Sequence, residues 1–129
     1  MNKESKILTL SEILNNTPRE LDIAGIGIIT VKDPTTQDRI DSREDAKKDA
    51  RWNELQEAEK SALVLDFMAI KMIVEPKITI EDYYKANSVT LINILNAVIM
   101  DYTKRFSELQ DKRKKEINAF LDQVKESNQ

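Results

Sequence analysis

The segment from Lys71 to Tyr84, KMIVEPKITIEDYY, constrains the fold more than any other part of this sequence. Proline has no backbone N–H and does not continue a helix, so Pro76 ends the apolar helical pattern before it. Proline also favours an extended backbone at the preceding residue, here Glu75. Shortly afterwards, Thr79 and Asp82 have the spacing of a helix N-cap and its partner. The segment therefore separates two helices by a tight connection.

Periodic apolar residues define the helices on either side of this connection. A helix from about Glu54 to Val74 is apolar on two faces, which indicates a central position in the core. We expect Trp52, just before it, to pack in that core rather than to anchor a partner. A short helix from Ile80 to about Ala86 follows. The last helix, from Val89 to about Glu126, would extend about 57 Å at a rise of 1.5 Å per residue.

The N-terminal part of the chain has a different character. Thr9 and Glu12 have capping-box spacing, which predicts a short helix of one or two turns. The stretch from Leu21 to Val31 is rich in Ile and Val and contains the only two glycines, Gly25 and Gly27. This pattern predicts two short strands with a bend between them. Such a ribbon is marginal alone, so it must lie against the helices or against a partner.

Together these elements predict a mainly α fold of the α+β kind. We expect a helical domain with a short N-terminal two-stranded β ribbon and a long C-terminal helix. Residues 1–129 fit a single domain, because a chain of this length holds one core of ordinary size.

An apolar stripe follows the whole last helix and is interrupted only by Arg113. The first half of the helix has further apolar residues and fits the core, whereas the second half has the stripe alone. Residues 107–129 are therefore expected to project as a helical extension that needs a partner. The alternative is a bend near residues 110–115 that folds the helix back onto its own core. The predicted partner-binding residues are Phe106, Leu109, Lys112, Arg113, Ile117, Phe120 and Val124.

The composition argues against catalysis. The chain has no His and no Cys, so it lacks the residues of imidazole or thiolate zinc sites, cysteine nucleophiles and Ser-His pairs. With only two glycines it also lacks a phosphate-binding glycine-rich loop. Acidic residues between Asp38 and Asp49 could suggest a Mg²⁺ or Ca²⁺ site and a metal-dependent hydrolase. Because basic residues alternate with these acids, a solvated helix face explains them better. We expect no enzyme activity, cofactor or metal.

Charge and hydropathy constrain the partners and the location. The formal charge of −3 argues against nucleic acid, which usually selects a basic domain. The basic cluster Lys112 to Lys115 has no interleaved aromatic residue and is better suited to steering an acidic protein partner. No window approaches the roughly 20 apolar residues of a membrane span, and the start MNKESK lacks the apolar region of a signal peptide. We expect a cytosolic protein that binds neither nucleic acid nor membranes.

The order of these parts resembles a known family. The ribbon runs into VKDPTTQDRI and a charged segment, and a Trp-led helix, the turn MIVEPKITIEDYY and a helix containing ILNAVIMDY follow. This order resembles the tail assembly chaperones of long-tailed bacteriophages and of prophages of Gram-positive bacteria. The resemblance covers roughly Leu21 to Tyr102. The strongly charged segment after Leu109 departs from it.

The resemblance implies a non-catalytic assembly factor in the host cell cytoplasm that is absent from the mature virion. Such chaperones bind the phage tape-measure protein and keep it soluble and competent for assembly of the tail tube. In many of these phages a frameshift-extended form also recruits the tail tube protein. The alternative function is a virion structural or connector (tail completion) protein that acts by self-association through the same long helix.

Overall fold

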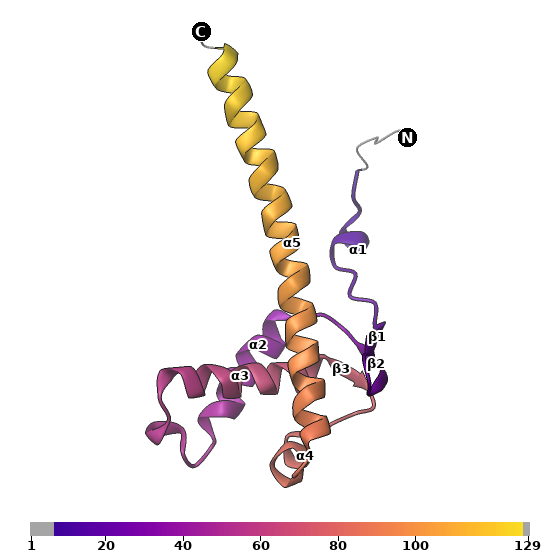
Figure 1. Ribbon diagram of the computed structural model, residues 1–129, viewed down its shortest axis with the longest axis vertical. Helices are drawn as coiled ribbons and strands as arrows, with labels where there is room; N and C mark the ends of the chain where they lie inside the picture. Colours follow the sequence, from indigo (N-terminus) through magenta and orange to yellow (C-terminus); the bar gives the residue numbers. More distant parts are fainter. Residues whose placement is uncertain (1–6, 128–129) are drawn as a thin grey trace.

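The computed structural model describes residues 7–127 and is mainly helical, which confirms the predicted fold class. Its central feature is a long helix that crosses a shorter one beside a small sheet (Figure 1). In chain order the elements are α1 (Leu10–Ile13), β1 (Arg19–Ile23), β2 (Gly27–Val31), α2 (Thr36–Lys47), a 3-10 turn η1 (Trp52–Glu54), α3 (Glu57–Met72), β3 (Ile73–Glu75), α4 (Ile80–Lys85) and α5 (Val89–Ser127).

The predicted N-terminal ribbon is present. Strands β1 and β2 pair antiparallel, with Leu21 opposite Ile29. The bend between them uses Gly25 and Gly27, whose φ angles of +79° and +145° suit glycine and strain other residues. Ahead of the ribbon, α1 begins with the expected capping box of Thr9. The local sequence therefore specifies this part of the chain well.

The central helix is shorter than predicted at both ends. Trp52 lies in the separate turn η1, and α3 begins only at Glu57. At the other end, Ile73–Glu75 forms strand β3 and pairs with β2, so the sheet has three strands instead of two. The β-branched residues before Pro76 continue the apolar pattern of the helix, but β2 offers them backbone hydrogen bonds in an extended conformation. A pattern of apolar residues alone cannot reveal that partner strand.

The core lies where α3, the sheet and the first half of α5 meet. The aromatic ring of Phe67 is fully buried and packs edge-on against Tyr83 of α4 at a centroid distance of 5.4 Å. Trp52 is half-buried at the margin of this core, with Lys60 over its ring. The buried apolar residues are Ile23, Ile29, Val31, Ala46, Leu63, Phe67, Met68, Ala69, Ile70, Met72, Ile73, Leu95 and Val98.

Helix α2 packs on α3 through small side chains. Ser42 and Ala46 are fully buried, and the Ser42 hydroxyl donates a hydrogen bond of 2.6 Å to the carbonyl oxygen of Asp38. Ile40, the largest apolar residue of the segment, is instead 49% exposed. The thin buried stripe of this charged helix therefore depends on close approach of the two helices rather than on a large apolar side chain.

Removing the ring of Phe67 tests the core. We expect Phe67→Ala to lower the free energy of unfolding by about 3–5 kcal/mol, because it leaves a cavity in a buried aromatic cluster. Urea unfolding followed by Trp52 fluorescence measures the change. Leu65→Ala is the matched control on the same helix, since Leu65 is 41% exposed and its loss should cost less than about 1 kcal/mol. Equal losses in the two variants would contradict this account of the core.

Candidate partner-binding surface

The second half of α5, residues Phe106 to Glu126, forms what we call the arm. Helix α5 is continuous from Val89 to Ser127, and every residue of the arm is exposed. Figure 1 shows this half of the helix extending beyond the other elements. There is no bend at residues 110–115, so the arm does not fold back onto the core.

The apolar face of the arm continues the face that packs in the core. Leu95 and Val98 of α5 are each 1% exposed, and Tyr102, one turn further, is partly buried. The same helix face then presents Phe106, which is 51% exposed, and Phe120, which is 63% exposed. Because residues spaced by about 3.6 positions share a face, one stripe is covered at one end and open at the other.

This open stripe, which we call the seam, contains most of the residues predicted from the sequence. Helical geometry places them on one face, with Arg113 near the middle. Lys112 lies about 100° away from Arg113 around the helix and flanks the seam. Leu121, which the prediction omitted, is 48% exposed and lies one turn from both Ile117 and Val124. The seam residues are Phe106, Leu109, Arg113, Ile117, Phe120, Leu121 and Val124.

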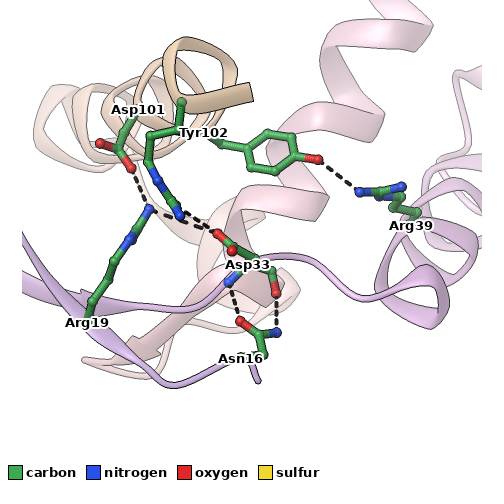
Figure 2. A network of polar contacts seen from close by, with 7 residues as sticks. Asn16, Arg19, Asp33, Arg39, Asp101 and Tyr102 are labelled. Atoms are coloured by element: carbon green, nitrogen blue, oxygen red, sulfur yellow. Dashed lines mark hydrogen bonds and ion pairs between the residues drawn. The ribbon is translucent and has the colours of Figure 1, made fainter. Parts of the chain in front are cut away.

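A polar network around Asp33 holds the root of the arm (Figure 2). The Asp33 carboxylate accepts a hydrogen bond of 2.8 Å from Arg105, the residue just before the arm. Arg19 of β1 lies 4.0 Å from the same carboxylate and donates a bond of 2.6 Å to Asp101. On the other side of α5, Arg39 of α2 donates a bond of 2.9 Å to the Tyr102 hydroxyl. The last turn before the arm is therefore fixed by elements distant in the sequence.

The same network positions the N-terminal segment. The Asn16 amide donates to the Asp33 carbonyl oxygen at 2.8 Å and accepts from the Asp33 backbone N–H at 2.9 Å. This pair anchors the chain between α1 and β1 beside the root of the arm. The segment beyond it is apolar and exposed, a second open surface that the sequence prediction did not include. Its exposed apolar residues are Ile7, Leu8, Leu10, Ile13 and Leu14.

A small hollow lies at the root of the seam. It has a volume of about 220 Å³ and is lined by Pro34, Tyr102, Phe106 and Leu109 together with charged residues. The rings of Tyr102 and Phe106 stack at a centroid distance of 6.3 Å and form one wall. An apolar side chain of a partner helix lying along the seam would fit here, since the hollow opens between the body and the first turn of the arm.

A larger open hollow, of about 830 Å³, lies near the start of α5 and is lined in part by Asp49, Arg51 and Tyr84. Hydrogen bonds from Arg51, and then from the Tyr84 hydroxyl, hold the pKa of Asp49 well below its usual value. Burial, followed by the bond to Asp49, raises the pKa of Tyr84 to about 12. Both groups keep one charge state at neutral pH, so they serve as a structural tie between the turn after α2 and α4.

A second tyrosine–carboxylate pair involves Tyr83, which also lines this hollow. The Tyr83 hydroxyl donates a bond of 2.8 Å to Asp66 of α3. Burial raises the pKa of the Asp66 carboxyl, although the bond from Tyr83 opposes the change. Burial and the same bond raise the pKa of Tyr83. These shifts follow from packing the pair against Phe67 and do not assemble a nucleophile with a base.

The acids of α2 are distributed among separate ion pairs. Asp38 lies 3.2 Å from Lys32, and Asp45 lies 3.0 Å from Lys71 of α3. Within residues 7–127, no cluster of acidic side chains could hold a metal ion. In the same range, no helix combines the length and apolar character that crossing a bilayer requires.

Comparison with protein-family models, with curated proteins and with solved structures finds no match to this chain.

Removing the guanidinium of Arg105 tests the root of the arm. We expect Arg105→Ala to lower the free energy of unfolding by at most about 1 kcal/mol, because the pair with Asp33 is partly exposed. Amide hydrogen exchange in residues 100–110 should nevertheless accelerate, since the last turn before the arm loses a tie to the body. Hydrogen exchange with mass spectrometry measures this, and Lys104→Ala is the matched control. Unchanged exchange would show that the pair does not hold the arm.

Acid unfolding tests the tie at Asp49. A carboxyl whose pKa is lower in the folded than in the unfolded state stabilises the fold above its unfolded pKa, about 3.9, and this contribution is lost as pH falls toward the folded pKa. The wild type should therefore lose more stability than Asp49→Asn between pH 5 and pH 3. Urea midpoints at both pH values measure the loss. Asp122→Asn on the exposed arm controls for removing one carboxylate. If Asp49→Asn loses as much stability as the wild type between pH 5 and pH 3, the Asp49 carboxylate is not the stabilising group.

Proposed function

We propose that this chain is a non-catalytic tail assembly chaperone that binds the phage tape-measure protein and keeps it soluble and competent for tail tube assembly. It would act in the host cytoplasm and leave before the virion is complete. The observation that carries the proposal is the seam, an apolar stripe on a continuous helix that is open to solvent along the whole arm.

The size of the seam suits a reversible binder. Fully burying one large apolar side chain contributes about 1.5–3 kcal/mol, and the seam residues are already partly covered by their own helix. Binding also costs free energy, because the partners lose translational freedom and their side chains become ordered. A modest net affinity remains after these costs. A chaperone needs this range, because it must cover the apolar face of a client helix and later release it.

The chemistry of the arm favours an amphipathic helix as the client. A stripe of apolar residues on one helix packs naturally on the stripe of another, as in helix-on-helix recognition. Arg113 lies within the seam, and Lys112 and Lys114 flank it about 100° away on either side, so an acidic client would be steered toward this surface. A tape-measure protein, with its long helices, is the kind of client that the family resemblance implies.

The resemblance supports the remaining parts of the proposal. It implies that a frameshift-extended product, where one is made, recruits the tail tube protein through its extension. The absence of His and Cys from the sequence supports a non-catalytic role. The alternative, a virion structural or connector protein, would use the same seam to build a stable ring.

Co-expression with the tape-measure protein of the same phage tests the proposal. We expect both proteins in one soluble complex on size-exclusion chromatography with light scattering. Replacing Phe120 and Val124 by Asp should abolish the complex while the melting temperature of the body stays unchanged, because charges on the seam oppose burial. The matched control replaces Asn118 and Ala119 by Asp, which places the same charges on the other side of the arm.

Two results would overturn the proposal. An insoluble tape-measure protein beside a free, ring-sized oligomer of this chain would favour the structural alternative. Equal loss of the complex in the seam variant and in its control would show that the seam is not the binding surface.

A further inference from the structure

We propose that the arms of two copies of this chain pair side by side in antiparallel orientation, centred near Lys115, and so cover the seam of each copy. The proposal concerns the interface between copies and does not depend on the identity of any client. Among the described residues, nothing covers the seam in the single chain.

The order of apolar residues favours this pairing. Read outward from Lys115, the seam meets Ile117, then Phe120 and Leu121, then Val124 in one direction. In the other direction it meets Arg113, then Leu109, then Phe106, so the spacing is similar from both ends, with Phe120 and Leu121 together matching Leu109. A two-fold axis at Lys115 would place Phe106 opposite Val124 of the second copy, and Leu109 opposite its Phe120 and Leu121. Such an interface is isologous, because each contact occurs twice.

The position of Arg113 favours the antiparallel over the parallel arrangement. It brings Arg113 of one copy opposite Ile117 of the other, beside Glu116 of that copy, and the symmetry repeats the ion pair. Neither Arg113 nor Glu116 has an ion-pair partner among the residues that the structure describes within the chain. A parallel, in-register pair would place the two Arg113 guanidinium groups against each other at the centre of the apolar seam. Like charges at that position destabilise a helix pair.

Shape and size are consistent with the same arrangement. The tip of one arm would reach the root of the other, where the hollow beside Phe106 can receive the Val124 side chain. The two bodies would lie at opposite ends of the pair. The contact is a single stripe of side chains over about 27 Å of helix, at 1.5 Å per residue, which is a short contact. The pair should therefore exchange with free monomers.

Cysteine cross-linking tests the orientation and the register, because the natural chain has no cysteine. Leu109→Cys and Phe120→Cys chains, made with tags of different size, are mixed and oxidised gently. The antiparallel pair predicts mostly mixed dimers of the two variants. A parallel pair predicts that each variant cross-links to itself, which would overturn the proposal.

The matched control uses the same register on the other side of the arm. In the antiparallel pair, positions 111 and 118 of the two copies lie opposite each other, as positions 109 and 120 do. The side chains of Asp111→Cys and Asn118→Cys, however, point away from the seam. We expect few mixed dimers from this pair. Mixed dimers at equal yield in both experiments would show random collision and would also overturn the proposal.

Charge reversal tests the central ion pair. Arg113→Glu should weaken self-association by about tenfold or more, because two acidic groups then meet twice across the axis. Adding Glu116→Arg to the same chain should restore it, since the pair is then exchanged. Sedimentation equilibrium measures the dissociation constants, and circular dichroism checks that the arm stays helical. A wild-type chain that stays monomeric at millimolar concentration, or a double variant no better than the single one, would contradict the pairing.

Discussion

The packing of the first half of α5 on α3 is the contact on which the rest of the structure depends. Leu95 and Val98 enter the core beside the fully buried Phe67, and this contact sets the direction of the whole of α5. Because residues spaced by about 3.6 positions lie on one face of a continuous helix, the residues of α5 that fill the core and the residues of the seam belong to one stripe. The body therefore determines both where the arm begins and which face it presents.

The polar contacts fix the geometry of this arrangement but contribute little to its stability. The ion pairs around Asp33 are partly exposed, and such pairs contribute little to the free energy of folding. Their geometry is nevertheless specific, because Asn16, Arg19 and Arg105 approach Asp33 from different elements. The network fixes the last turn of α5 before the arm, and it brings the apolar N-terminal segment beside the same point.

An exposed seam on a fixed arm gives the proposed function and the proposed pairing a common physical basis. Apolar surface that is open to water favours any partner that can cover it. If a second copy covers it in the absence of a client, the seam stays out of water until a client helix competes for it. This part of the argument depends on the proposed chaperone role. Both contacts must then be weak enough to exchange, as the small area of the seam suggests.

Local patterns in the sequence determined the caps at Thr9 and Thr79, the glycine bend, the end of the helix pattern before Pro76 and the apolar stripe of α5. These features depend on residues close together in the chain, so their physical causes can be read directly. Only the tertiary structure decided that Ile73–Glu75 is a strand, because its partner β2 lies far away in the sequence. It also decided the contacts of Asp33 and Asp49 and the exposure of the arm. Each of these features depends on which residues from distant parts of the sequence come into contact. The spacing of side chains within one segment does not reveal such contacts.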